Sequence, residues 1–254
     1  MKSLKRTEVR KILHILMLFC VACTVCSACI LLWNQWQYHQ GDVSYRKISQ
    51  AHQSSKAAGT EPKEQKEPID FTALRKINPE VVGWIAAPGT EIDYPVVQGK
   101  DNAYYLRRLF SGEWNKLGSI FMDYRNTSNF SDRNTIIYGH NMKNTSMFSS
   151  LSRYKEQGFY DSYPSMMIYT PEGDFKVELF AGTVVDGSYE AVRRSFRDDR
   201  DFQDYIESLE KKSTFKAAVT VEKGERIVTL CTCSYEFSNA RYALFGKLTP
   251  MPHL

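Results

Sequence analysis

Two cysteines near the C-terminal end of the chain, Cys231 and Cys233, have the residue type and placement for nucleophilic chemistry. They stand at i and i+2 in an apolar run over residues 225–233 that predicts a β-strand, so both side chains point to the same side. A thiol reacts as its thiolate, which a neighbouring cation favours and burial disfavours. Cys233 ends its strand and adjoins the loop to Arg241, whose guanidinium can offer donors to an oxyanion. We therefore expect Cys233 to be the reactive thiol and Cys231 to be more enclosed.

Histidine is a frequent partner of a reactive thiol, and elimination leaves one candidate among the five histidines. His140 alone follows an apolar run, residues 135–138, within the C-terminal part of the chain; the others lie near the N-terminal apolar segment, in the polar segment that follows it, or at the C-terminus. Spacing alone also allows a buried cysteine, a strand-end histidine and a surface arginine. A metal site fits less well, because one histidine and two cysteines at i and i+2 lack the usual four-ligand set.

Short apolar runs bounded by Gly, Pro, Asn or Asp predict the strands that must position these side chains. They lie at residues 81–85, 94–97, 119–122, 135–138, 165–169, 175–185, 217–221, 225–233 and 241–248. Helical patterns occupy residues 71–77 and 195–212, with shorter ones at 102–109 and 146–153. In the long helix Phe202, Ile206 and Leu209 share one face, and Ser195 with Asp198 suits its start. Strands and helices do not alternate regularly, which favours a mainly β fold, an antiparallel barrel or sandwich with helical insertions.

An apolar segment near the N-terminus predicts a transmembrane helix. Residues 15–33 carry no charge, and nineteen residues at about 1.5 Å each span roughly 28 Å, close to the thickness of a bilayer's hydrocarbon core. The run is longer than the core of a signal peptide and lacks a nearby small-x-small cleavage site. Its four cysteines recur every third residue, like iron–sulfur ligands, but a continuous membrane helix lacks the loop geometry of a cluster. Because basic residues precede it, we expect a cytoplasmic tail at 1–11, an anchor at 12–33 and an extracellular remainder.

Composition divides the remainder into a stalk and a single domain. Residues 34–68 are polar and aperiodic, which predicts an extended stalk that contributes nothing to the core. Residues 69–254 have the length of one ordinary domain. The formal net charge of +4 is accounted for by the first eleven residues, where five basic residues stand against Glu8. The neutral remainder gives no electrostatic reason to expect nucleic-acid binding.

Two motifs in the proposed domain resemble those of a known enzyme family. Thr229-Leu230-Cys231-Thr232-Cys233, with Arg241 after a short loop, resembles the Thr-Leu-x-Thr-Cys signature of sortases. Tyr138-Gly139-His140-Asn141-Met142-Lys143, followed by Ser146-Met147-Phe148, is similar to the histidine segment of class B sortases. The resemblance covers roughly residues 71–248. It implies an eight-stranded sortase-type β-barrel with helical insertions behind an N-terminal transmembrane helix, in a Gram-positive bacterium, with no cofactor and no metal.

The resemblance also implies roles for individual residues. Cys233 would be the nucleophile, His140 the general acid and base, and Arg241 the group that orients the substrate and stabilises the oxyanion. The residues implied to line the peptide groove are Asn102, Leu106, Tyr138 and Thr232. Many class B enzymes have Ser at the position of Cys231 and an acidic residue at that of Ser234, and both departures bear on the substrate preference near the scissile bond.

The reaction implied is transpeptidation at the cell surface. The thiolate attacks the Thr carbonyl of a C-terminal sorting signal of the Asn-Pro-x-Thr-x type in an exported protein and forms a thioester. An amine then resolves the thioester, from a lipid-linked peptidoglycan precursor or a pilin lysine. Two alternatives stay open, a cell-wall cysteine peptidase that hydrolyses and a membrane-anchored binding module with a buried cysteine. The order of His140 before Cys233 disfavours papain-like enzymes, whose cysteine comes first.

Overall fold

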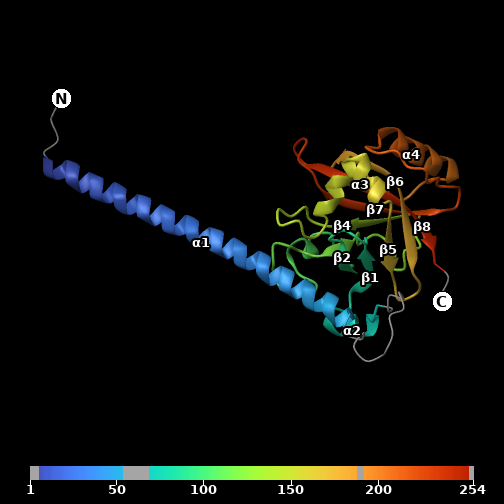
Figure 1. Cartoon of the computed structure of the whole chain (residues 1–254), viewed down its shortest axis with the longest axis horizontal. Helices are drawn as coiled ribbons and strands as arrows, with labels where there is room; N and C mark the ends of the chain where they lie inside the picture. Colours follow the sequence, from blue (N-terminus) through green and yellow to red (C-terminus); the bar gives the residue numbers. More distant parts are fainter. Residues whose placement is uncertain (1–5, 54–68, 188–191, 252–254) are drawn as a thin grey trace. The chain divides into compact units, whose positions relative to one another are not determined.

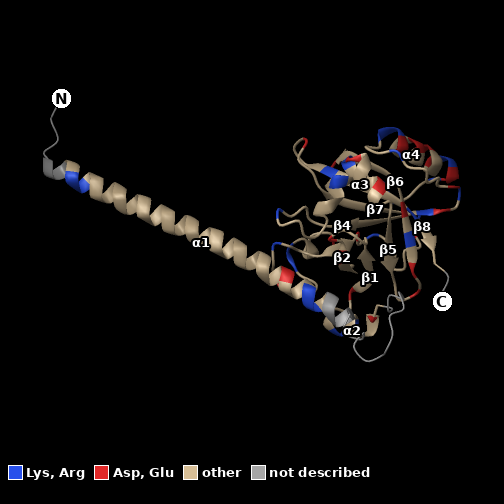
Figure 2. Ribbon diagram, viewed as in Figure 1, with Lys and Arg blue, Asp and Glu red and all other residues tan. Residues whose placement is uncertain are grey.

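The structure, a computed structural model, describes residues 6–53, 69–187 and 192–251 (Figure 1). The chain divides into one unit up to Gln40 and a second from Gly41 onward. Most of helix α1 (Arg6–Gln53) belongs to the first unit. No Lys, Arg, Asp or Glu occurs between Lys11 and Asp42, as Figure 2 shows, and the large apolar side chains of this stretch are exposed. Among the described residues, α1 is the one helix long and apolar enough to cross a membrane.

The second unit contains a closed barrel of eight strands, which confirms the predicted fold. The strands are β1 (Val81–Ala86), β2 (Asp93–Val97), β3 (Ile120–Met122), β4 (Asn134–Tyr138), β5 (Ser165–Tyr169), β6 (Phe175–Asp186), β7 (Arg226–Cys233) and β8 (Ala240–Pro250). Their order around the barrel is β1-β2-β3-β4-β7-β8-β6-β5. The pairs β2–β3 and β4–β7 are parallel, and the other pairs are antiparallel.

The strand order brings distant segments of the sequence together at one end of the barrel. β4 lies beside β7 with Tyr138 opposite Cys231, although 93 positions separate the two residues. β8 lies on the other side of β7 and places Arg241 directly opposite Cys233. Residues opposite each other on antiparallel strands share a face, with Cβ atoms about 4.5–5.5 Å apart. The candidate histidine, cysteine and arginine segments therefore meet at the ends of three adjacent strands.

Within the described part of the second unit, three helices and two 3₁₀ segments accompany the barrel: α2 (Phe71–Ile77), η2 (Tyr104–Arg107), η3 (Ser149–Lys155), α3 (Gln157–Ser162) and α4 (Asp199–Lys212). The apolar face of α4, with Phe202, Ile206 and Leu209, is buried against the barrel as predicted. Its start differs from the prediction, because the Asp198 carboxylate accepts the backbone N–H of Asp201 at 2.8 Å and caps the helix there. Ser195 lies outside the helix.

Residues 217–221, which the sequence predicted as a strand, form none in the structure. The Val221 side chain is buried, as an apolar run predicts, but the segment packs beside α4 instead of joining the barrel. The carbonyl of Val221 accepts a hydrogen bond from Nε2 of Gln203 on α4, and the carbonyl of Thr220 accepts one from Lys247 Nζ. Side chains thus satisfy carbonyls that a neighbouring strand would otherwise bind.

The expected extended stalk is wrong for the residues that follow the apolar segment, since α1 continues to Gln53. Tyr45 and Ile48 are each 7% exposed and belong to the core of the second unit. The Tyr45 hydroxyl donates to the carbonyl of Gly118 at 2.7 Å, and its ring packs edge-on against Tyr94. The physical reason is the spacing of Tyr45 and Ile48, which places both on one helix face that the domain buries. Residues 54–68 of the expected stalk lie outside the described residues.

Because the end of α1 contributes buried side chains, a chain starting at residue 69 should be less stable than one starting at residue 41. Losing the burial of Tyr45 and Ile48 costs roughly 3 kcal/mol or more, which lowers Tm by on the order of 10 °C. Thermal unfolding of the two chains measures the difference. Within the longer chain, Tyr45→Ala should reproduce much of the loss, whereas Lys47→Ala, at an exposed position of the same helix, should not. Equal Tm values for the two chains would show that α1 adds nothing to the domain.

Candidate active site

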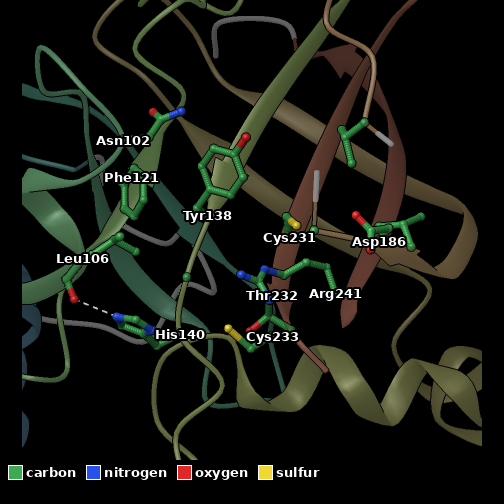
Figure 3. A pocket seen from close by; sticks show the side chains of 14 residues that line it. Asn102, Leu106, Phe121, Tyr138, His140, Asp186, Cys231, Thr232, Cys233 and Arg241 are labelled. Carbon is green, nitrogen blue, oxygen red and sulfur yellow. Dashed lines mark hydrogen bonds between the residues drawn. The ribbon is translucent and has the colours of Figure 1, made fainter. Parts of the chain in front are cut away.

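A cavity of about 290 Å³ opens at the barrel end where β4, β7 and β8 meet (Figure 3). The structure brings all seven residues singled out from the sequence to its wall: Asn102, Leu106, Tyr138, His140, Thr232, Cys233 and Arg241. Cys231 also lines it, together with an apolar surface that the sequence did not identify, made of Phe121, Val185 and Val192. The cavity is therefore lined both by reactive groups and by apolar side chains.

The two cysteines differ in their environment. Cys231 is buried, and Cys233 at the end of β7 is partly exposed. Burial raises the pKa of the Cys231 thiol to about 12, although the nearby guanidinium of Arg241 opposes this shift. Cys231 is therefore a neutral thiol at physiological pH. In Figure 3 the sulfur of Cys233 points toward the imidazole of His140, so Cys233 is the thiol placed for chemistry.

The hydrogen bond of His140 determines which ring nitrogen is free to react. Its Nε2 lies 2.6 Å from the carbonyl oxygen of Leu106, drawn as a dashed line in Figure 3. A carbonyl only accepts, so Nε2 carries a proton, and in the neutral ring Nδ1 is the unprotonated nitrogen. The backbone holds this position, because Gly139 N donates to the Cys231 carbonyl at 3.1 Å and Phe148 N donates to the His140 carbonyl at 3.0 Å.

Gly139 is required by close packing beside these two segments. A Cβ atom at this position would lie 2.5 Å from Cδ1 of Ile120 and 2.7 Å from the ring of Phe148. Glycine therefore lets the chain run close to the neighbouring core between the end of β4 and His140.

Arg241 enters the cavity from the start of β8. It lies opposite Cys233, and its Nη1 donates to the carbonyl of Ala240 at 3.1 Å, which leaves further donors of the planar fork for a ligand. Figure 3 shows the guanidinium on the cavity side of β7, close to the cysteines. A fixed positive charge with several donors at this place suits an anion that develops on a carbonyl attacked by Cys233.

Asp123, which the sequence did not single out, connects two of the residues that line the cavity. Its side chain is fully buried, and its Oδ2 accepts hydrogen bonds from Asn102 Nδ2 and from the Tyr138 hydroxyl, both at 3.0 Å. Burial raises the pKa of Tyr138, and the negative charge of Asp123 raises it further. The sequence signal that could have found Asp123 is an acidic residue directly after the apolar run at 119–122, at a strand end that faces the site.

Ser234, directly after Cys233, contacts the acidic side chain of Glu236 two residues further along the chain. Its hydroxyl donates to the carboxylate of Glu236, and Lys155 Nζ lies 3.0 Å from the Ser234 oxygen and pairs with Glu236. Hydrogen bonds from Lys155 and Ser234 lower the pKa of Glu236 to about 2, so this carboxylate is ionised. An acidic group therefore lies close to the end of β7 that carries Cys233, and its ion pair with Lys155 anchors the β7–β8 loop to η3.

Thr232 has a hydroxyl without a hydrogen-bond partner among the described residues. The residue is 1% exposed, and its Oγ1 has no hydrogen-bond partner in the described part of the chain. Buried hydroxyls are normally paired. The Thr232 hydroxyl is an exception to this rule, and because its oxygen is buried it offers no surface to a ligand.

Comparisons with known proteins agree with this geometry. The profile of the sortase domain matches residues 85–249. Sortase B of Listeria monocytogenes is 40% identical over 177 residues, which cover 69% of this chain and 72% of the relative. The structure of a Staphylococcus aureus sortase B–substrate complex matches with a TM-score of 0.77 and 31% identity, over 85% of this chain and 100% of the other. A sortase B structure in complex with triglycine matches with a TM-score of 0.75 and 32% identity, over 84% and 99%.

Proposed function

The chain belongs to the sortase family and to its class B, the cysteine transpeptidases, and from that premise we propose that Cys233, His140 and Arg241 carry out the transfer. The observation that carries this proposal is the convergence of the three side chains on one cavity from β7, the segment after β4, and β8. Each side chain has the chemistry that its role needs. Cys233 has a partly exposed thiol, His140 has one ring nitrogen hydrogen-bonded to the backbone and the other free, and Arg241 has a permanent positive charge.

The proposed first step is acylation of the enzyme. The Cys233 thiolate attacks the carbonyl carbon of the Thr in the sorting signal, and the oxyanion that forms is stabilised by Arg241. As the thiolate forms, the Cys233 thiol proton passes to the free Nδ1 of His140, and the leaving amine takes that proton when the C–N bond breaks. The product is a thioester between Cys233 and the Thr carbonyl.

The second step releases the exported protein onto its acceptor. An amine attacks the thioester carbonyl while His140 accepts its proton, the C–S bond breaks, and the amide forms as the Cys233 thiolate is restored. The substrates we propose are exported proteins with an Asn-Pro-x-Thr-x signal. The acceptor is an amine of a lipid-linked peptidoglycan precursor or of a pilin. The matches to a sortase B–substrate complex and to a sortase B–triglycine complex support a peptide donor and an amine acceptor.

We also propose that α1 anchors the enzyme in the cell membrane with the catalytic domain outside. The support is an uncharged run from residue 12 to residue 41, preceded by basic residues. Residues 1–11 then form the cytoplasmic tail and residues 12–33 the anchor. The catalytic domain is expected to extend N-terminally to the end of α1, because Tyr45 and Ile48 are part of its core.

The function predicts a product that a hydrolase or a binding module does not make. Incubating the detergent-solubilised enzyme with an Asn-Pro-x-Thr-x peptide and triglycine should give cleavage after Thr and a peptide extended by three glycines, which mass spectrometry identifies. Without triglycine, the thioester between the peptide and the enzyme should accumulate and be hydrolysed slowly, because water is then the remaining nucleophile. Hydrolysed peptide as the sole product at high triglycine concentration would favour the peptidase. No cleavage and no adduct with any peptide would favour the binding module.

A further inference from the structure

One buried carboxylate oxygen holds two side chains of the cavity wall that come from different elements. Asn102 precedes η2 and Tyr138 ends β4, and both hydrogen-bond to Oδ2 of Asp123 at 3.0 Å. Arg125 closes the network with Nη2 at 2.7 Å from Oδ2 and Nε at 2.8 Å from Oδ1. Although burial opposes ionisation, hydrogen bonds from Arg125 and Asn102 hold the pKa of Asp123 below its usual range. Asp123 is therefore an ionised acceptor.

The ionised state determines the direction of both hydrogen bonds. A carboxylate only accepts, so the Tyr138 hydroxyl donates its hydrogen bond to Asp123. The lone pairs of the Tyr138 oxygen are then left to accept a hydrogen bond from a ligand in the cavity. The side-chain amide of Asn102 donates one N–H to Asp123, and its Oδ1 accepts a hydrogen bond from the backbone N–H of Tyr124 at 3.1 Å. The amide orientation of Asn102 is therefore fixed, with its second N–H left to donate.

We propose that Asp123 is a positioning residue for the substrate, because it makes Tyr138 an acceptor and Asn102 a donor toward the cavity. A peptide amide group, with one N–H and one carbonyl, complements this pair. The inference rests on the proposed function, since the peptide is the sorting signal. Asp123 does not touch the reacting atoms: His140 is held by Leu106 and Phe148, and Cys233 by its strand. Its effect should therefore be on peptide binding.

The test is Asp123→Asn in the full chain, assayed by steady-state peptide cleavage. The amide has the same shape but replaces one acceptor oxygen with a donor, so Asn102, Tyr138 and Arg125 can no longer all be satisfied. Hydrogen bonds to charged groups are strong enough that we expect KM to rise about tenfold or more. We expect kcat to change less than about threefold, and the rate of Cys233 alkylation by iodoacetamide to stay that of the wild type.

Asn126→Asp is the matched control. Asn126 is buried in the same loop and binds Asp132 and the backbone of β4, but it does not line the cavity. This variant should lower Tm without a specific rise in KM. If Asp123→Asn does not fold, Tyr138→Phe carries the test, because it keeps the Asp123–Arg125 pair and removes only the oriented hydroxyl; KM should again rise severalfold with kcat retained.

The outcomes separate this inference from the proposed function. If the wild-type enzyme cleaves the peptide and Asp123→Asn leaves KM unchanged, the positioning role is overturned and the proposed function stands. The same holds if Asp123→Asn lowers kcat and alkylation in parallel with Tm, as a merely structural residue would. A wild-type enzyme that cleaves no sorting peptide overturns the proposed function, and the positioning role with it.

Discussion

Replacing Cys233 with alanine is expected to abolish both thioester formation and peptide cleavage, while Cys231→Ser keeps activity within about tenfold of the wild type. Loss of a nucleophile from a catalytic group that acts as a unit costs roughly 10⁵-fold or more in kcat. Cys231 cannot substitute, because its buried thiol with a pKa of about 12 supplies only about 10⁻⁴ of its population as thiolate at pH 8.

Intact mass after incubation with an Asn-Pro-x-Thr-x peptide, without an amine acceptor, measures this difference directly. The wild type and Cys231→Ser should gain the mass of the acyl group, and Cys233→Ala should not. Cys231→Ser serves as the matched control, since it changes a thiol two residues away on the same strand. The serine hydroxyl is buried in its place, so a lower Tm is expected for it. An adduct on Cys233→Ala, or its loss in Cys231→Ser alone, would reverse the assignment.

Arg241→Lys should lower kcat/KM by roughly 10²–10³-fold, comparable to the loss of an oxyanion donor in other acyl-transfer enzymes. Lysine keeps the positive charge but replaces the planar fork with a single ammonium, which cannot donate in two directions at fixed spacing. The fold should be unaffected, because the hydrogen bond of the Arg241 side chain, 3.1 Å long, goes to the carbonyl of the preceding residue at the rim of the barrel. Arg241→Ala should lose at least as much activity.

The matched control is Arg226→Lys on β7. Arg226 also donates to a backbone carbonyl, that of Phe130 at 2.9 Å, and it does not line the cavity. It should therefore keep near-wild-type kcat/KM, and Tm should report any structural cost of the Arg-to-Lys change itself. Equal activities for the two variants would remove Arg241 from the mechanism.

Local features of the sequence were enough to predict most elements of the barrel. Eight of the nine apolar runs form its strands. A run of strand-forming residues between turn residues can be recognised locally, because the signal comes from residues that are neighbours in the sequence. The same holds for the buried face of α4. The run at 217–221 met the same criteria and failed, because joining a sheet also needs a free strand edge, and the closed barrel offers none there.

The sequence was enough to predict the three residue types of the candidate site, a cysteine, a histidine and an arginine. It did not predict how deeply each side chain is buried or which side chains hydrogen-bond to one another. Cys231 and Cys233 look alike in the sequence, and only the barrel makes one buried and the other partly exposed. Asp123 appeared as an ordinary acidic residue until folding placed Asn102 and Tyr138 on its carboxylate. These contacts join residues 15 to 21 positions apart through the strand order, which no local pattern encodes.

The sequence by itself determined the residue types of the chemistry, the strands that carry them and the uncharged helix at the N-terminus, because each depends on residues close together in the chain. The tertiary structure decided that β4 lies parallel to β7, that the end of α1 packs into the domain through Tyr45, and that one thiol is accessible. Closing the barrel buries apolar surface from all eight strands at once, so the favoured order depends on the whole domain. The environment of each reactive group follows from that order.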